Sequence, residues 1–343
     1  MQIIIKIFNI SRRLFKSIGK REIKISRLIK YFNWLERKDK FSLAYHTNDI
    51  DKDKKFFIDK KLWPKKISAC IAFSFKEERL DFLTKICKNL ENINDNIDLT
   101  IVVNQLGFTK RDLITKKISE ASSLKINFFC PQNLLDPRLL PLAHYEIVRE
   151  KIKSKEFTHF LYLEDDILIN EKNIKYWITA RESLKQYNLI PSFLRTEIQI
   201  KTNEKYLVDT PKKNNLFFQP KISNKSKDFA FVNLLNFYCG AYFYDRDLML
   251  EHLNGPSQSL DFGHGTYSPK WIIPEMQELG LLERASAGLA FKDIPKGFFH
   301  RNVVPVDLEK KKVKEYCLIE HLSNKYVKIK SDFSSIKVED IFY

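Results

Sequence analysis

Long apolar runs and paired cysteines are both missing from this chain of 343 residues. No stretch reaches the roughly 18 to 20 apolar residues that a membrane-spanning helix requires. The apolar start at residues 3–8 is short, and it lacks the small-residue cleavage site of a secretory signal. Five scattered cysteines include no Cys-x-x-Cys pair, which is typical of reduced thiols in a cytosolic protein. The sequence therefore predicts a cytoplasmic protein.

The signatures of several enzyme classes are missing as well. The sequence contains no Gly-rich dinucleotide-binding motif, no P-loop and no His-Glu-x-x-His motif. These absences argue against dehydrogenases, kinase-like enzymes and zinc proteases. No recognised nucleic-acid-binding module stands out either, so we expect no nucleic-acid partner.

Acidic residues are in the minority, with 43 Asp and Glu against 59 Lys and Arg and a formal net charge of +16. This charge favours an anionic partner such as a membrane surface, a nucleic acid or a phosphorylated substrate. Most of the excess is lysine, whereas planar recognition of phosphate would favour arginine. A lysine-rich composition therefore explains the charge as well as a specific partner does.

The first 62 residues differ from the rest in being basic and poor in glycine. Their apolar residues approximate helical spacing, which predicts an amphipathic N-terminal arm over residues 1–62. Such an arm can lie on an anionic membrane surface, or it can pack on its own domain. Trp63 and Pro64 mark the boundary with the segments that follow.

From residue 66 onward, short apolar runs alternate with longer helical patterns. Alternation of this kind predicts an α/β fold with a mostly parallel central sheet and right-handed crossovers. Asn170 is expected to cap a helix that runs to Tyr187. The lysine-rich stretch 198–228 predicts a surface connection or a small hairpin. The expected strands are 67–75, 99–103, 126–130 and a run beginning near 160, and the expected helices before Asn170 are 77–90, 110–122 and 142–153.

Three consecutive acidic residues, Glu164, Asp165 and Asp166, end the strand expected near residue 160. Ligands of open α/β sheets bind beyond the carboxyl ends of the strands. Carboxylate oxygens suit Mg²⁺ or Mn²⁺, which bind through one or two carboxylates together with substrate phosphates. The alternative is that Asp165 or Asp166 only turns the chain and caps a helix.

Three strand-end segments carry a resemblance to a known family. Residues 71–78 match a first strand and the loop beneath a nucleotide base, Asn104 follows the second strand, and residues 161–166 match an acidic motif that is usually Asp-x-Asp. In this order the segments resemble the nucleotide-sugar glycosyltransferases of the GT-A fold, over residues 66–300. Two positions depart from the family pattern, because Asn104 stands where an acid is usual and Glu164 replaces the first Asp.

The resemblance implies a Rossmann-type α/β/α sandwich with a catalytic domain over residues 63–305. Its nucleotide-binding half would span 66–170, its acceptor half 171–305, and a C-terminal extension 306–343. By analogy Asp166 binds a Mn or Mg cation, and Glu164 or Asp165 contacts the sugar or ribose. The other donor-binding residues that it implies are Phe73, Ser74, Glu77, Asn104 and Arg138.

The later segments of the resemblance imply an acceptor site. Tyr238 and Gly240 lie in a stretch that resembles the strand beside the acceptor pocket, although Gly240 also fits a simple bulge. Trp271 and Glu275 lie in the following segment, whose acid is the general base of inverting members. Glu275 after Pro274 also fits the first turn of a helix, where the dipole favours an acid.

Two further positions complete the implied site. Asp261, in a Gly-flanked polar loop, is the reserve candidate for the base. His300 falls where many family members supply a late histidine to the metal, and His321 is its rival. A lone histidine is more often structural than a metal ligand, so both readings stay open.

The expected function is transfer of a sugar from a nucleotide-diphosphate donor to a hydroxyl of a glycan or lipid-linked acceptor. The resemblance places this activity in bacterial surface-polysaccharide assembly, and the basic arm would hold the enzyme at the cytoplasmic membrane face. One alternative is a nucleotidyltransferase that uses the acidic strand end for Mg²⁺. A second is a basic nucleic-acid-binding protein without enzymatic activity, which salt-dependent retention on DNA would reveal.

Overall fold

Three β-sheets and the helices around them form the part of the chain that the computed structural model describes, namely residues 45–47, 62–104, 106–132, 134, 137–210, 213–255 and 283–343. Most of the expected N-terminal arm lies outside these residues. None of the described helices is both long enough and apolar enough to cross a bilayer.

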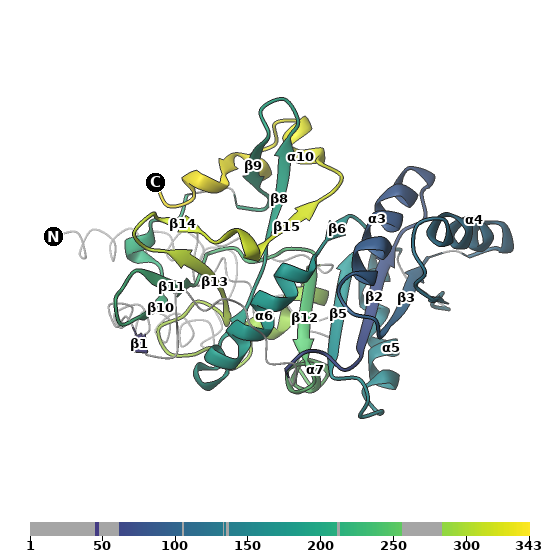
Figure 1. Ribbon diagram of the computed structural model, residues 1–343, viewed down its shortest axis with the longest axis horizontal. Coiled ribbons are helices and arrows are strands. Elements are labelled where there is room, and N and C mark those ends of the chain that lie inside the picture. Colours follow the sequence, from purple (N-terminus) through teal and green to yellow (C-terminus); the bar gives the residue numbers. More distant parts are fainter. Residues whose placement is uncertain are drawn as a thin grey trace, which may run out of the picture.

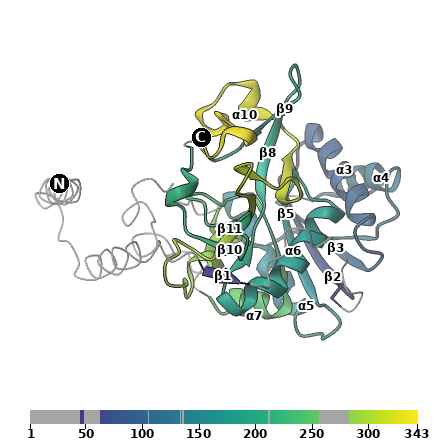
Figure 2. The ribbon, with the colours of Figure 1, turned by 60° about the vertical axis from the view of Figure 1, so that its left-hand side comes forward.

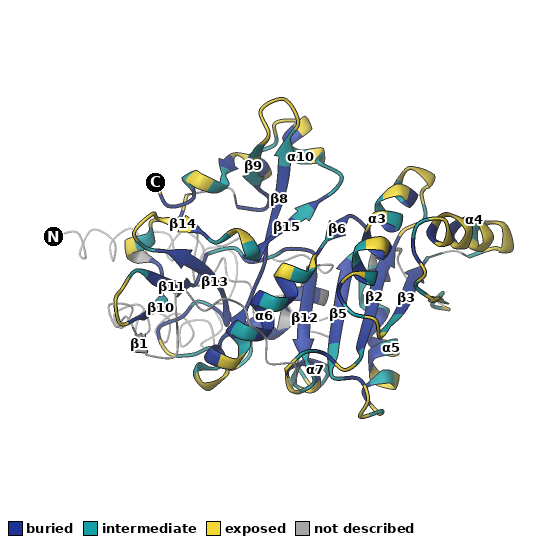
Figure 3. Ribbon diagram, in the orientation of Figure 1, coloured by how far each residue is buried: buried dark blue, intermediate teal, exposed yellow. Residues whose placement is uncertain are grey.

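The central sheet is mostly parallel, as the sequence predicted. Its strand order is β12-β5-β2-β3-β4, and only β12 runs antiparallel to its neighbour. All seven residues of β2 are buried, which explains its continuous apolar run (Figure 3). The strands are β2 (Ile67–Phe73), β3 (Ile97–Val103), β4 (Ile126–Phe129), β5 (His159–Glu164) and β12 (Ala241–Asp245).

The helices that pack on this sheet follow the predicted order (Figure 1). Asn170 caps α6 as expected, because its side chain accepts from the backbone amides of Lys172 and Asn173 at 2.9 and 3.2 Å. Trp177 of α6 packs edge-on against Phe243 of β12 at 5.0 Å. The helices of this part are α3 (Leu80–Glu91), α4 (Phe108–Ser119), α5 (His144–Lys151), α6 (Glu171–Leu184) and α7 (Arg246–Leu253).

A second sheet has the order β1-β10-β11-β13-β14, with β7 paired to β13. Its first strand belongs to the N-terminal segment and pairs in parallel with β10. Two short helices, α9 (Arg284–Ala287) and η6 (Gly288–Phe291), precede β13. The strands are β1 (Tyr45–Thr47), β7 (Ile190–Pro191), β10 (Lys221–Asn224), β11 (Phe229–Val232), β13 (Asn302–Asp307) and β14 (Lys312–Val313).

The third sheet joins the end of the chain to the middle. In the order β16-β9-β8-β15-β6, strand β15 pairs with β8 in parallel and with β6 antiparallel. Strand β6 follows β5 after a short turn, so the third sheet begins at the carboxyl end of β5 (Figure 1). Figure 2 shows β8 and β9 of this sheet from a second direction. Its strands are β6 (Ile167–Leu168), β8 (Leu194–Gln199), β9 (Glu204–Leu207), β15 (Leu318–His321) and β16 (Ile336–Lys337), and α10 (Lys325–Lys328) follows β15.

Buried histidines make the fold sensitive to acid. Burial lowers the pKa of His144 to about 3, that of His300 to about 3 and that of His159 to about 4. These rings stay neutral in the folded protein at pH values where the unfolded chain binds protons, so each one destabilises the fold as the pH falls.

We predict that this effect can be isolated at His144, whose Nε2 lies 2.6 Å from the hydroxyl of Tyr242. Between about pH 6 and pH 4, wild type should lose about 1.4 kcal/mol of unfolding free energy per pH unit more than His144→Gln does. Urea denaturation across this range measures the difference, which should vanish above about pH 7.5. Parallel pH profiles of the two proteins would contradict the prediction.

Candidate functional site

Three acidic side chains lie at the carboxyl end of β5. Glu164 ends the strand, and Asp165 and Asp166 form the turn that leads into β6. Both aspartates are only 3% exposed. A buried carboxylate is costly unless it is paired, so the partners of each acid define the chemistry of this turn.

Asp166 is paired with a histidine from the last part of the chain. Strand β15 pairs antiparallel with β6 and places His321 opposite Ile167, directly after the acidic turn. Nδ1–H of His321 donates to Glu197 Oε1 at 2.6 Å, and Nε2 lies 3.0 Å from Asp166 Oδ2. His321 is therefore held between two carboxylates from different strands.

Asp166 and His321 shift each other's pKa in opposite directions. Burial alone would raise the pKa of Asp166, but the hydrogen bond and the charge of His321 outweigh burial and hold that pKa at about 2. Burial alone would lower the pKa of His321, whereas the hydrogen bonds to Asp166 and Glu197 raise it above its ordinary value. The carboxylate of Asp166 is thus ionised at neutral pH.

Asp165 has one paired oxygen and one unpaired oxygen. Nη1 of Arg79, which precedes α3, donates to Asp165 Oδ1 at 2.5 Å. Oδ2 is buried and has no hydrogen-bond partner among the described residues. Burial raises the pKa of Asp165 to about 6, although Arg79 acts in the opposite direction. An orphaned buried oxygen of this kind is suited to a donor from a ligand, such as a hydroxyl group.

Glu164 is held by groups from β8 and from the segment before β12. The hydroxyl of Tyr238 donates to Glu164 Oε1, and Nη1 of Arg195 lies 3.7 Å from Oε2. Arg195 is 4% exposed, stacks 5.1 Å from the Tyr238 ring centroid and pairs with Asp209. The carboxylate of Glu164 therefore has a fixed position beside a buried cation.

Gly240 allows this position. Its φ of +67° is in the left-handed region, and a Cβ at this site would lie 2.9 Å from Glu164 Oε2 and 3.1 Å from Ile167 Cγ1. The backbone amide of Glu164 also donates to the Gly240 carbonyl at 2.9 Å. The absence of a side chain at Gly240 therefore allows the close approach of Glu164 from the same chain.

We predict that Gly240→Ala lowers the unfolding free energy by about 1 to 3 kcal/mol, because both the backbone strain and the contact with Glu164 act against it. Gly107→Ala is the control, since Gly107 has a negative φ and open space around its Cβ position, and its loss should be smaller. Urea denaturation at pH 8 measures both. Equal stability of Gly240→Ala and wild type would show that the turn adapts without strain.

Of the residues predicted to bind the nucleotide, some lie at the carboxyl ends of β2 and β3 and others do not. Ser74 and Glu77 are exposed just beyond β2, and Asn104 follows β3. Asn104 Oδ1 accepts from the amide of Phe75 at 3.3 Å, so these two loops are joined. The Phe73 side chain, however, is fully buried in the core and does not reach this surface. The side chain of Arg138 lies outside the described residues.

The prediction that His300 binds the metal requires a correction. Nε2–H of His300 donates to the carbonyl of Leu234 at 2.6 Å, and Nδ1 accepts from the amide of Asn302 at 3.1 Å. The ring is fully buried and packs 4.2 Å from Phe237. Because both nitrogens of His300 are engaged by the protein, this ring is not available to a metal, and His321 is the histidine that lies beside Asp166.

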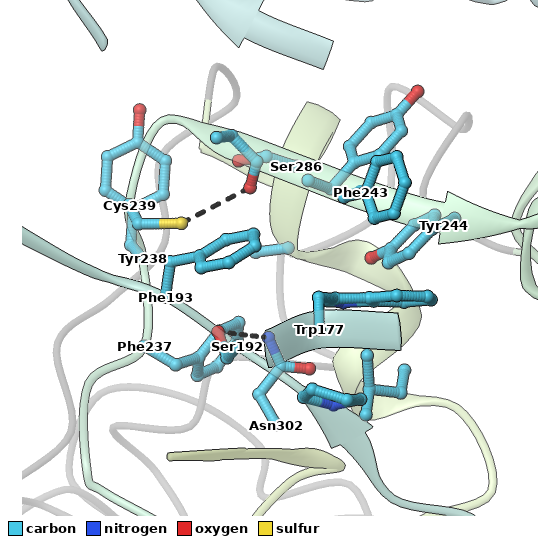
Figure 4. Close-up of a pocket in the computed structure, with 15 residues that line it drawn as sticks. Trp177, Ser192, Phe193, Phe237, Tyr238, Cys239, Phe243, Tyr244, Ser286 and Asn302 are labelled. Atoms are coloured by element: carbon cyan, nitrogen blue, oxygen red, sulfur yellow. Dashed lines mark hydrogen bonds between the residues drawn. The ribbon is translucent and has the colours of Figure 1, made fainter. Parts of the chain in front are cut away.

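The acceptor side is incompletely described, because Asp261, Trp271 and Glu275 lie outside the described residues. A cavity of about 20 Å³ lies beside β12. Aromatic side chains line it, together with Ser192, Ser286 and Asn302 (Figure 4). A volume of this size holds about one water molecule and not a sugar. Asn302 Oδ1 has no partner among the described residues, so a water here would satisfy it. Tyr238 lines this cavity, and its hydroxyl donates to Glu164 Oε1.

Asp166 and His321 are the residues at the acidic turn that could hold a divalent cation. Within the described ranges, no group of three or more His, Cys, Asp or Glu side chains is arranged to hold a metal ion. Asp166 and His321 nevertheless offer two neighbouring ligand atoms, and the ionised Asp166 carries the required charge. Mg²⁺ and Mn²⁺ sites commonly use few protein ligands and complete their shell with phosphate oxygens and water.

Sequence reasoning missed three residues of this site, Arg79, Arg195 and Glu197. Arg195 and Glu197 lie in β8, just before the stretch 198–228 that the sequence predicted to be a surface connection or a small hairpin. Their burial depends on the pairing of β8 with β15, which the local pattern does not reveal. The i, i+2 spacing of two charged residues among apolar ones was the available signal, because it places both on one face of a strand.

No protein-family model and no curated protein matches this chain. Solved structures show loose similarity. The galactosyltransferase LgtC with donor and acceptor sugar analogues aligns at 11% identity over 65% of this chain and 70% of its own, with a TM-score of 0.31. A mannosyltransferase from Pyrobaculum calidifontis in complex with GDP-Man and Mn²⁺ aligns at 9% identity over 66% and 54%, with a TM-score of 0.34. A 4-diphosphocytidyl-2C-methyl-D-erythritol synthase from Anaerococcus prevotii aligns at 11% identity over 57% and 77%, with a TM-score of 0.30.

Proposed function

We propose that this protein is a metal-dependent glycosyltransferase. It would transfer a sugar from a nucleotide-diphosphate donor to a hydroxyl of a glycan or lipid-linked acceptor. The observation that carries the proposal is the pairing of Asp166 with His321 at the carboxyl end of an interior parallel strand, next to the unpaired oxygen of Asp165. Substrates of open α/β sheets bind at this end of the strands.

Asp166 and His321 would hold a Mn or Mg cation, which as a Lewis acid neutralises the charge that develops on the leaving diphosphate. Asp165 Oδ2 would accept a hydrogen bond from a hydroxyl of the ribose or the sugar, while Arg79 fixes the other oxygen. Glu164, held by Tyr238 and Arg195, would line the sugar side of the turn.

The acceptor proton needs a separate base. We keep Glu275 as the candidate and Asp261 as its reserve, because the resemblance over residues 271–277 supports a carboxylate there. A single base on the acceptor side implies direct displacement and therefore inversion at the anomeric carbon. In this proposal the basic N-terminal segment holds the enzyme near anionic lipid, where a lipid-linked acceptor would be found.

We predict that Asp166→Asn preserves folding and lowers turnover by about 10² or more, because the amide keeps the shape of the side chain and loses its charge. A thermal-shift screen of nucleotide sugars with and without Mn²⁺ would first identify the donor. Transfer of a radiolabelled sugar to acceptor then measures turnover.

Asp98→Asn is the control, since Asp98 pairs with Lys151 at the opposite end of the sheet. Full activity of wild type in excess EDTA would refute metal dependence. Release of pyrophosphate from a nucleoside triphosphate, without sugar transfer, would instead support a nucleotidyltransferase.

We also predict that Glu275→Gln retains donor and Mn²⁺ binding while turnover falls by about 10² to 10⁴, the usual contribution of a general base. Asp261→Asn, assayed in parallel, tests the reserve candidate. The anomeric configuration of the product, read by NMR, tests the mechanism independently. A retained configuration would exclude direct displacement, and an active Glu275→Gln enzyme would move the base to another carboxylate.

A further inference from the structure

The carboxylate of Glu197 lies directly behind His321. Glu197 and His321 occupy neighbouring strands β8 and β15, and both side chains are fully buried. Glu197 Oε1 accepts from Nδ1–H of His321 at 2.6 Å, on the side of the ring that faces away from Asp166. The three side chains therefore form a continuous line from the acidic turn into the protein interior.

Glu197 is itself held in place by the backbone. The amide of Val327 donates to Glu197 Oε2 at 2.6 Å, and the amide of Tyr326 lies 3.3 Å from Oε1 as a second donor. The ring of Tyr326 stacks on His321 with centroids 5.7 Å apart. The two backbone donors restrict rotation of the Glu197 carboxylate. Its hydrogen bond to Nδ1–H therefore fixes the orientation of the His321 ring.

This arrangement determines which ring nitrogen is presented to the site. A histidine can bind a metal through either nitrogen, and the hydrogen bond made by one nitrogen decides the role of the other. Because Nδ1–H donates to Glu197, Nε2 is the nitrogen that faces Asp166 and can bind a cation when it carries no proton. Carboxylates behind metal-binding histidines commonly fix the ring orientation in this way.

We propose that Glu197 is a positioning residue that orients His321 so that Nε2 and Asp166 bind a divalent cation together. The proposal rests on the proposed function, because it assigns the cation to Asp166 and His321. Glu197 touches neither donor nor acceptor in it. A purely structural alternative is that Glu197 serves only to anchor the segment around Val327 to β8.

Binding of Mn²⁺ alone to the full chain distinguishes these roles. Titration followed by electron paramagnetic resonance measures free and bound Mn²⁺ without any assay of activity. Glu197→Gln should weaken Mn²⁺ binding by about 10- to 100-fold. The nitrogen hyperfine coupling of bound Mn²⁺, which reports ligation by His321, should be present in wild type, absent in His321→Ala and reduced in Glu197→Gln.

A double-mutant comparison tests whether Glu197 acts through His321. In a His321→Ala background, Glu197→Gln should cause no further loss of Mn²⁺ affinity, because the ring that it positions is gone. Glu204→Gln is the matched control, since Glu204 lies in the same sheet and pairs with Lys337. Its Mn²⁺ affinity should equal that of wild type.

The outcomes separate this proposal from the proposed function. If wild type binds Mn²⁺ and Asp166→Asn does not, but folded Glu197→Gln binds as wild type does, the positioning role is refuted and the metal site stands. Equal losses from Glu197→Gln with and without His321 would favour the structural alternative. No Mn²⁺ binding by wild type would overturn both. If Glu197→Gln does not fold, Glu197→Asp, which keeps the charge and shortens the reach, should show the same loss of affinity and of nitrogen coupling.

Discussion

Negative charge buried at the carboxyl end of β5 is the constraint around which this part of the molecule is built. In the described part of the chain, five carboxylates gather there, and three basic side chains from separate segments pair with them. The carboxylates are those of Glu164, Asp165, Asp166, Glu197 and Asp209, and the basic side chains are Arg79, Arg195 and His321. Because an unpaired buried carboxylate costs several kcal/mol, each basic side chain must be in position when the chain folds.

The pairing of β15 with β6 and β8 brings two of these three basic side chains to the acidic turn. Arg79 comes from the turn before α3, Arg195 from β8 and His321 from β15, so segments distant in sequence meet at one turn. Buried ion pairs contribute little net stability, because desolvation offsets much of the Coulomb attraction. What they supply is a fixed geometry. Charges held in place before substrate arrives need no reorganisation during a reaction, and this preorganisation is a large part of enzymatic catalysis.

Local patterns predicted the parts of the structure that local physics determines. The alternation of apolar runs and helical segments predicted the parallel sheet, and Asn170 predicted the start of α6. Both predictions were possible because strand burial and helix capping depend on a few neighbouring residues. The acids at the end of β5 were found in the same way. The partners of those acids were not, since the pairing of β15 with β6 and β8 joins residues about 125 to 155 positions apart. Neither propensity nor periodicity carries information over that separation.

The choice between two histidines shows what local reasoning could not reach. His300 follows an apolar segment and lies among Phe237 and Phe291, where burial without a charged partner lowers its pKa to about 3. His321 is just as buried, yet its pKa is raised, because carboxylates lie at both ring nitrogens. Equal burial therefore goes with opposite pKa shifts, because the direction depends on whether carboxylates lie beside the ring. His321 lies between the carboxylates of Asp166 and Glu197, whereas the described neighbours of His300 are neutral amide, carbonyl and aromatic groups. For this physical reason the acidic turn and His321 form one site, to which His300 does not belong.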